Sequence, residues 1–180
     1  YIAEQIRERS DDGDESFMFG FEVSNGYMLN ASVRDKDGVM AAVAIAEIAA
    51  LSKSKGLTLI DQLDSLHKLY GYASEKSICI EGAGVGDKFM EHLRSLNGTL
   101  GEPGTELGIL DVRNYADYMP ESNVLLYELN GLDWIAFRPS GTEPKFKIYY
   151  GFYGTESAAE SRLERISKAV VAEINKYKEN

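Results

Sequence analysis

The hydrophobic and polar positions of the first third of the chain predict one strand among several helices. Residues 17–23, FMFGFEV, are apolar and rich in aromatic side chains, as expected of a buried strand. Helical spacing of apolar residues predicts helices over residues 2–9, 37–54 and 59–70. A strand followed by two longer helices is typical of an α/β unit, and we interpret this region as part of one.

The two longer helices begin with side chains that are suited to capping. Asp37 is the expected N-cap of the first, because its carboxylate can accept hydrogen bonds from free backbone N–H groups. Thr58, with Asp61 three residues further on, forms a variant of the capping box. The first helix is rich in alanine, so we expect it to pack closely against a sheet. The leucines of the second helix align on one face.

Beyond residue 75 the pattern changes to short apolar runs separated by turns. Two of these runs meet through Asn130-Gly131, a pair that favours a tight hairpin. The pattern predicts strands at 76–81, 107–113, 145–153 and twice within 123–140, and helices at 86–96 and 156–177. We therefore assign residues 1–75 to a partial α/β domain and residues 76–180 to an α+β domain with an antiparallel sheet and two helices.

The charge and composition of the chain limit the classes of binding partner that we expect. The net charge of −10 argues against general nucleic-acid binding, which needs a basic face. The longest apolar run is too short to span a bilayer, so no membrane partner is expected. Cys79 is the single cysteine; it alternates with isoleucines and is interpreted as a small core residue. No intrachain disulfide can form, which fits a reducing, cytoplasmic location.

One stretch runs against the acidic character of the chain. It combines three cationic side chains, two hydroxyl groups and a glycine that exposes backbone N–H groups: Arg138, Ser140, Gly141, Thr142, Lys145 and Lys147. Arginine can bind two phosphate oxygens at once, and hydroxyl and N–H donors can satisfy the others. A surface turn whose basic residues only solubilise a strand edge is the alternative. The combination favours a phosphate-binding loop.

Two motifs resemble those of a known enzyme family. RPSGTEPKFKIY, residues 138–149, closely resembles the C-terminal phosphate-binding loop of the α-D-phosphohexomutases, the phosphoglucomutases and phosphomannomutases. GFEVSNGY, residues 20–27, is similar to the sugar-binding loop of that family, and VRDKDGV at 33–39 follows it as in the bacterial phosphoglucomutase-like branch. Together with the last helix, the resemblance covers nearly the whole chain.

The sugar-binding resemblance implies contacts from Glu22 and Ser24 to sugar hydroxyl groups. These residues lie two apart, so both would point the same way from an extended segment. An ionised carboxylate accepts hydrogen bonds from hydroxyl groups more strongly than a neutral side chain does. Val23 departs from the second glutamate that is common in the motif. Residues 34–36, a charge cluster before a helix, are interpreted as capping and solvated salt bridges, with a minor chance of contacting ligand.

The resemblance also implies what lies elsewhere in such an enzyme. The family has four domains, with a phosphoserine in a T-A-S-H-N-P-like loop and Mg²⁺ on a D-G-D-x-D segment. Neither motif occurs in this sequence, so no catalytic or metal-binding residue is expected in it. The chain also begins at Tyr1. We therefore interpret it as a C-terminal fragment, inactive alone, that binds hexose phosphate for the third and fourth domains of a mutase.

The implied reaction interconverts hexose 1-phosphate and hexose 6-phosphate, of glucose, mannose or both, through glucose 1,6-bisphosphate or its equivalent. Partners are then the hexose phosphate and the N-terminal domains of the same protein. Self-association is also expected, because residues 1–75 would leave a sheet edge and an apolar face uncovered. A stand-alone phosphosugar-binding module without catalysis is the alternative. A purely structural interaction domain explains neither motif and ranks last.

Overall fold

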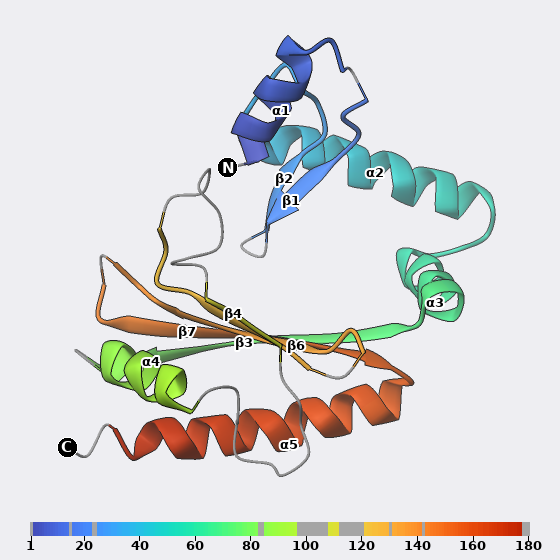
Figure 1. The fold of residues 1–180 in the computed structure, drawn as a ribbon. Coiled ribbons are helices and arrows are strands. Elements are labelled where there is room, and N and C mark those ends of the chain that lie inside the picture. Colours follow the sequence, from blue (N-terminus) through green and yellow to red (C-terminus); the bar gives the residue numbers. More distant parts are fainter. Residues whose placement is uncertain are drawn as a thin grey trace. The chain divides into compact units, whose positions relative to one another are not determined.

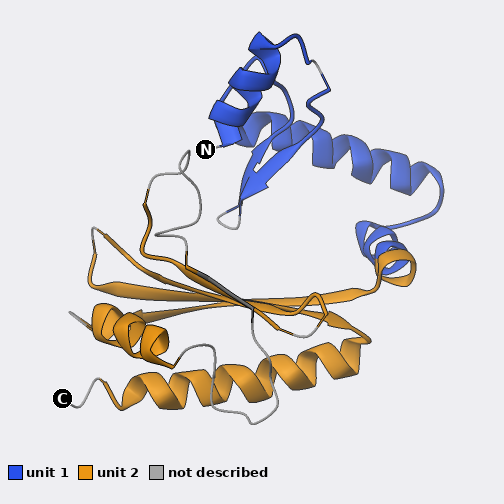
Figure 2. Ribbon diagram, viewed as in Figure 1, with its two compact units in different colours: residues 1–66 blue, residues 67–180 orange. Residues whose placement is uncertain are grey.

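The computed structural model describes residues 2–14, 16–22, 25–82, 85–96, 108–111, 121–129, 131–141 and 143–177. The chain divides into two compact units, residues 1–66 and 67–180 (Figure 2). The two are described separately below. None of the described helices is long and apolar enough to cross a membrane.

The first unit combines helices with a small antiparallel sheet (Figure 1). Its elements are α1 (Ile2–Asp11), β1 (Gly20–Glu22), β2 (Gly26–Met28), α2 (Gly38–Ser54) and α3 (Leu59–Tyr70), of which α3 crosses the division between the units. In the sheet, Gly20 pairs with Met28 and Glu22 pairs with Gly26. The predicted order of one strand region between helices is confirmed, with the strand region folded into a hairpin.

Both predicted helix starts are confirmed. The carboxylate of Asp37 accepts hydrogen bonds from the N–H groups of Val39 at 2.9 Å and Met40 at 3.1 Å. At the start of α3, the N–H of Thr58 donates to Asp61 at 2.7 Å, and the N–H of Asp61 donates to the Thr58 hydroxyl at 3.1 Å. This reciprocal pair is a capping box with aspartate in place of glutamate.

The prediction of a buried strand over 17–23 is wrong. The strand covers only Gly20–Glu22, and the Phe19 and Phe21 side chains are exposed. Their rings stack on each other at 5.8 Å, and Phe19 stacks on Tyr27 at 6.2 Å. Alternation along a strand assigns side chains to two faces but does not say which face is covered. Here the aromatic face of the two-stranded sheet has no covering layer among the described residues of this unit.

Close packing of the alanine-rich helix is also not observed. Among the described residues, Ser52 is the only buried residue of α2. The leucine stripe of α3 is likewise exposed, and α3 has no buried residue. Both helices therefore carry apolar side chains that their own unit does not bury.

The second unit is a five-stranded antiparallel sheet with two helices. The strands run in the spatial order β3-β7-β6-β5-β4, and Figure 1 shows α4 and α5 on the same side of this sheet. The elements are β3 (Tyr72–Glu81), α4 (Val85–Ser95), β4 (Gly108–Asp111), β5 (Leu125–Glu128), β6 (Trp134–Pro139), β7 (Lys145–Gly154) and α5 (Glu156–Asn175). The predicted α+β domain is confirmed, although its expected hairpin residue Asn130 lies outside the described residues.

The core of this unit lies between the sheet and the helices. Phe89 of α4 is fully buried, and its ring meets those of Phe137, Phe146 and Tyr177 at 5.6 to 6.0 Å. Alternate residues of β6 and β7 supply the sheet side of the core, as period-two patterning requires. The tyrosine-rich end of β7 also packs as predicted, because Tyr150 and Phe152 are buried.

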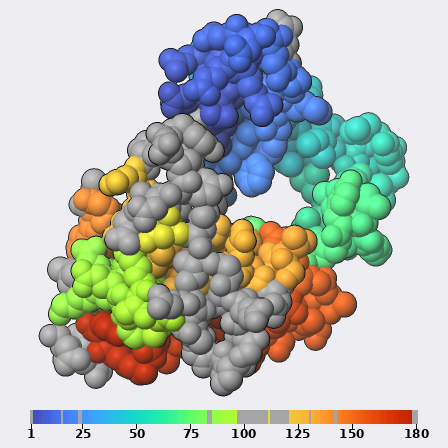
Figure 3. All heavy atoms as spheres, in the orientation of Figure 1, coloured from blue at the N-terminus to red at the C-terminus, as the bar shows by residue number. Residues whose placement is uncertain are grey.

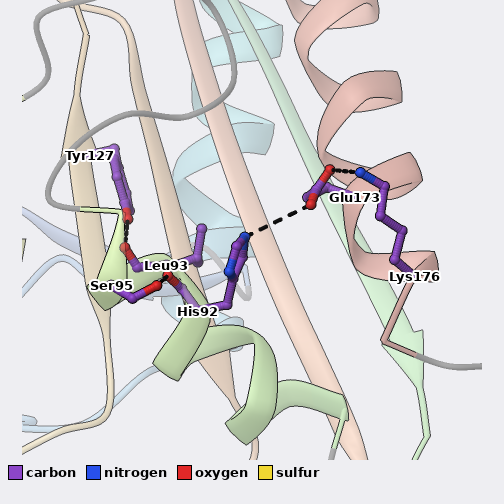
Figure 4. Close-up of polar contacts among 6 residues, drawn as sticks. All are labelled: His92, Leu93, Ser95, Tyr127, Glu173 and Lys176. Atoms are coloured by element: carbon purple, nitrogen blue, oxygen red, sulfur yellow. Dashed lines mark hydrogen bonds and ion pairs between the residues drawn. The ribbon is translucent and has the colours of Figure 1, made fainter. Parts of the chain in front are cut away.

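Helix α4 contacts both the end of α5 and the sheet. In Figure 3 the atoms of α4 and of the end of α5 lie against each other. The His92 imidazole faces Glu173 at 3.8 Å (Figure 4). The same imidazole packs on the Tyr177 ring, with 5.2 Å between the ring centroids. On the other side, the Tyr127 hydroxyl donates to the Leu93 carbonyl at 3.2 Å. These contacts fix α4 between the sheet and α5.

An ion pair between the buried Asp133 and the half-buried Arg162 ties the start of β6 to β7 and α5. The Asp133 carboxylate lies 2.8 Å from Arg162 Nε and accepts the N–H of Tyr153 at 2.8 Å. Arg162 also donates to the Tyr153 carbonyl at 2.6 Å. Each charge has several hydrogen-bond partners, which offset the free-energy cost of removing the pair from water. The same contacts hold the register of β6 and β7.

Strand β3 differs from its prediction in length and in one side chain. It begins at Tyr72 rather than 76, because it pairs with β7 along its whole length, from Tyr72 opposite Gly154 to Glu81 opposite Lys145. The sequence-based boundary at residue 75 therefore falls inside β3. Cys79 is exposed, so its interpretation as a core residue is wrong. It pairs with Lys147 on the face of the sheet opposite the helices, whereas its neighbour Ile80 is buried.

Candidate phosphate- and sugar-binding sites

Two cationic side chains oppose each other on the helix-free face of the second unit. Arg138 near the end of β6 is the register partner of Lys147 in β7, and both are exposed. Their strand neighbours Phe137, Phe146 and Ile148 point into the core. The alternation of β6 and β7 therefore places both cations on one surface, beside the turn that joins the strands (Figure 1).

This arrangement is unfavourable without a bound anion. Like charges directly opposite each other on adjacent strands destabilise a sheet. Among the described residues, neither side chain forms an ion pair or a hydrogen bond, so the two charges are not neutralised within the described part of the chain. A dianion placed between them would convert this repulsion into two attractions.

The turn between β6 and β7 is held by its own hydrogen bonds. The N–H of Ser140 donates to the Lys145 carbonyl at 2.8 Å, and the N–H of Glu143 donates to the Ser140 hydroxyl oxygen at 3.3 Å. The Pro144 carbonyl accepts the N–H of Gly82 at 3.0 Å, which fastens the turn to the end of β3. The backbone N–H of Ser140 is therefore used within the turn, whereas its hydroxyl proton remains able to donate to a ligand.

Gly141 lies at the exposed tip of the turn. A Cβ at this position would have no heavy atom within 4 Å, so the space around its backbone is open. Within the described part of the turn, this is the position where a ligand can approach the main chain most closely. Thr142, the other predicted hydroxyl donor, lies outside the described residues.

Lys145 differs from the other two cations. It forms an ion pair with Glu143 at 3.1 Å, and the hydrogen bond and charge of Glu143 raise the pKa of the Lys145 ammonium. Both groups reach solvent, so the pair contributes little to stability. A phosphate would have to compete with Glu143 for Lys145, whereas Arg138 and Lys147 have no such competitor among the described residues.

The predicted sugar-binding loop lies in the first unit, at the tip of the β1–β2 hairpin. Glu22 ends β1, and its carboxylate lies 3.0 Å from the Lys36 ammonium. The hydrogen bond from Lys36 and the charge of Glu22 raise the pKa of Lys36. Ser24 lies outside the described residues. Sequence reasoning assigned Lys36 to a solvated salt bridge but did not identify Glu22 as its partner, because fourteen residues separate the two.

One cavity in the described structure lies away from both predicted sites. A cavity of about 580 Å³ lies in the first unit between α1 and the segments near residues 16 and 32. Arg9 and Arg34 line it together with serine and apolar side chains. None of the predicted binding residues lines this cavity.

The described residues contain no grouping of histidine, cysteine, aspartate or glutamate side chains that could hold a metal ion. The residues present therefore do not fit the Mg²⁺ that the family resemblance implies.

Comparison with known proteins identifies the class to which this fold and these motifs belong. Residues 1–70 match the family model for phosphoglucomutase/phosphomannomutase, alpha/beta/alpha domain III. The match confirms the α/β interpretation of the first region. The chain belongs to the α-D-phosphohexomutase family.

Individual relatives cover both units. The chain is 31% identical over 152 residues to a probable phosphomannomutase of Haemophilus influenzae, a match that covers 81% of this chain and 30% of the relative. It is 31% identical over 199 residues to the human glucose 1,6-bisphosphate synthase, covering 98% of this chain and 32% of the relative. The chain thus spans about a third of the length of these curated relatives.

A solved structure shows the same fold. The open form of the Paramecium phosphoglucomutase parafusin superposes with a TM-score of 0.72 at 19% identity, over 99% of this chain and 34% of that one. At this identity the likeness bears on the fold alone. It supports the architecture described above, a mixed helical unit followed by an antiparallel sheet with two helices.

Proposed function

We propose that the chain provides the substrate-binding part of a phosphohexomutase, which interconverts hexose 1-phosphate and hexose 6-phosphate of glucose, mannose or both. In this proposal the second unit binds the phosphate group and the first unit binds sugar hydroxyl groups. The relatives are named as phosphomannomutase, phosphoglucomutase and glucose 1,6-bisphosphate synthase, and these names all refer to phosphorylated hexoses. Family membership therefore supports a sugar phosphate as the ligand.

The opposed pair Arg138 and Lys147 carries the proposal. Its two charges match a phosphate dianion, and the planar guanidinium of Arg138 can donate to two phosphate oxygens in parallel. Ser140 can add a hydroxyl donor from the turn, and Gly141 leaves room for close approach. Lys145 would join on leaving Glu143. Thr142 stays a predicted donor on the strength of the motif.

The Glu22 carboxylate suits the sugar rather than the phosphate. A negative charge would repel a phosphate but can accept hydrogen bonds from sugar hydroxyl groups. Ser24 stays a predicted second contact. A mutase must bind its sugar in two orientations, so that either phosphate can reach the same reactive group. A cationic clamp and a hydroxyl acceptor on separate elements meet that requirement, because neither depends on which carbon bears the phosphate.

The proposed reaction needs groups that the described residues do not supply. A phosphoserine would donate its phosphoryl group to the sugar phosphate, and the bisphosphorylated sugar would reorient and return its other phosphate. Mg²⁺ would be held outside the described residues and, when bound, would stabilise charge on the transferring phosphoryl group. The residues of this chain would bind and orient the substrate while water is excluded. A cytoplasmic location belongs to the same proposal.

The test is a kinetic comparison of the intact mutase that carries this chain. Arg138→Ala should lower kcat/KM for glucose 1-phosphate by at least about tenfold, since a charged hydrogen bond contributes about 1.5–3 kcal/mol. Lys168→Ala is the matched control, because it removes an exposed charge on α5, away from the helix-free face. The control should keep its activity within about twofold.

The outcomes separate the competing functions. Equal kinetics for the Arg138→Ala variant and the parent would reject the phosphate clamp. Tight binding of hexose phosphate that depends on Arg138, without turnover by the intact protein, would favour the stand-alone binding module. Turnover by the isolated 180-residue chain would contradict the assignment of the phosphoserine to another part of the enzyme.

A further inference from the structure

The side chains of Glu22 and Lys36 approach each other above a glycine, Gly26. Gly26, the register partner of Glu22, is buried and lies beneath both side chains. A Cβ on Gly26 would come within 2.2 Å of Lys36 Cδ, 2.7 Å of Lys36 Cγ and 2.8 Å of Glu22 Cγ. Gly26 does not have a positive φ, so its backbone does not require glycine. The lysine stem that crosses it does.

The backbone of the lysine is fixed from both sides. The N–H of Lys36 donates to the Asp35 carboxylate at 2.7 Å. The N–H of Asp37 donates to the Tyr27 carbonyl at 2.9 Å, which joins the segment to β2. Asp37 is also the N-cap of α2. Lys36 thus projects from the link between a strand and a capped helix.

The direction of the lysine side chain follows from this anchoring. Its stem runs across Gly26 and its ammonium ends at Glu22 Oε1, at 3.0 Å. An exposed ion pair contributes little to stability. Stabilisation alone therefore does not explain why a buried glycine makes room for this pair. An ion pair that fixes the direction of a carboxylate serves a binding site, where misplacement by about 1 Å is costly.

We propose that Lys36 is a positioning residue, which orients the Glu22 carboxylate toward the sugar hydroxyl groups through an ion pair that Gly26 makes room for. This inference rests on the proposed function, because it presumes that Glu22 contacts the sugar. Lys36 itself contacts neither the sugar nor the phosphate. Its loss therefore weakens recognition of the hydroxyl groups and leaves recognition of the phosphate unchanged.

The test uses two ligands and a double-mutant cycle in the intact protein. Affinities for glucose 1-phosphate and for inorganic phosphate are measured by calorimetric titration in the parent, Glu22→Gln, Lys36→Met and the double variant. Lys36→Met should weaken glucose 1-phosphate binding by about three- to tenfold, as expected for loss of an aligned charge-assisted hydrogen bond. Inorganic phosphate should bind all four proteins equally.

The cycle shows whether the lysine acts through the glutamate. If it does, the double variant should bind glucose 1-phosphate no more weakly than Glu22→Gln alone. Lys36→Arg, which keeps the charge, should recover part of the loss. Lys53→Met removes an exposed charge from the last turn of α2 and should change neither affinity.

A glycine pair tests the space requirement. Gly26→Ala should reproduce the loss seen for Lys36→Met, because the new methyl group displaces the lysine stem and the Glu22 side chain. Gly38→Ala is the control, since a Cβ at Gly38 meets no heavy atom within 4 Å and its φ is not positive. Equal glucose 1-phosphate affinity in Gly26→Ala and the parent would overturn the inference.

The failure of the inference and that of the proposed function give different results. If Glu22→Gln binds glucose 1-phosphate as tightly as the parent, the proposed sugar contact fails. If Glu22→Gln weakens binding but Lys36→Met does not, only the positioning role fails. Additive losses in the double variant, or weaker inorganic phosphate binding by Lys36→Met, would show that Lys36 contacts the ligand directly and would also overturn the inference.

Discussion

Apolar residues make up similar fractions of the two units, but the two units bury them to different extents. In the second unit, apolar side chains from the sheet, α4 and α5 form a single buried cluster. In the first unit, Ile6 and Met28 are the only buried hydrophobic side chains among the described residues. All but one of the exposed large hydrophobic residues of the described chain lie between Met18 and Tyr70, the exception being Leu132.

The difference indicates that the second unit buries its apolar side chains within itself, whereas the first unit does not. A helix that is apolar on all sides is typical of a protein interior, and α2 has this character through most of its length. The antiparallel sheet of the second unit has one face covered by helices and one left open, which a stable domain can tolerate. We therefore expect the second unit to carry most of the stability of the chain and the first unit to carry most of its tendency to associate.

The largest expected effect is on the core of the second unit. Phe89→Ala should lower the free energy of unfolding by about 3–5 kcal/mol, because it removes a fully buried ring that meets three others. Leu66→Ala, in the first unit at a side chain that is 52% exposed, should change it by less than about 0.5 kcal/mol. Urea denaturation followed by fluorescence of Trp134, the single tryptophan, measures both. Similar losses for the two variants would remove the contrast between the units.

Alkaline pH should also destabilise the second unit. Burial raises the pKa of the Tyr127 hydroxyl from about 10 to about 12, so the folded state retains a proton that the unfolded state has lost. The resulting stability is fully present below pH 10 and is lost as the pH rises through 12, a change of about 3 kcal/mol.

Replacing a tyrosine by phenylalanine shows how much that tyrosine contributes to the decline of stability with pH. Tyr127→Phe should flatten the decline, and Tyr150 should account for part of the remainder, because burial raises its pKa in the same direction. Urea titrations at pH 9 and pH 11 measure the change. An unchanged slope in Tyr127→Phe would show that Tyr127 ionises as freely in the folded state as in the unfolded state.

Association should depend on the first unit. Leu51→Glu introduces a charge on the apolar surface of α2, at a side chain that is 57% exposed. Loss of about 1.5 kcal/mol from an apolar contact would weaken association about tenfold. Sedimentation velocity over a concentration series measures the dissociation constant, with Lys147→Glu on the open sheet as the matched control. A chain that stays monomeric at high concentration would reject the expected association.

The smallest expected effect is the difference in stability loss between removing the N-cap side chain of α2 and removing that of α5. Asp37→Ala should cost about 1 kcal/mol, because the carboxylate satisfies two N–H groups at the start of α2. Thr155→Ala at the start of α5 should cost less, since no side-chain cap hydrogen bond is made there. Amide hydrogen exchange of the first turns of α2 and α5 compares the two locally. Equal losses of protection would show that the cap at Asp37 is not what holds the start of α2.

Sequence reasoning succeeded where the determinants of structure are local. Capping by Asp37 and by the Thr58–Asp61 pair needs only residues within a few positions of each other. The strand lengths and the burial of single residues depend on pairing at long range. The extension of β3 back to Tyr72 follows from its pairing with β7, and the exposure of Cys79 follows from which face of the sheet the helices cover.

The candidate sites show the same division. Alternation along β7 was enough to predict that Lys147 points away from the core. That Arg138 lies directly opposite it could not be read from the sequence, because it depends on the register of two strands. The contact between Glu22 and Lys36 depends on how a hairpin meets a helix start. Gly26 lies between the two side chains, and its part in their contact was not predicted from the sequence.

The central claim is that the open turn between β6 and β7 binds the phosphate group of a hexose phosphate. The most direct measurement is a titration of the ¹⁵N-labelled protein with glucose 1-phosphate, with amide shifts followed by NMR. The account predicts saturable shifts at Arg138, Ser140, Gly141 and Lys147, which inorganic phosphate reproduces and Arg138→Ala abolishes. Shifts that saturate elsewhere while these four residues remain unperturbed would contradict it.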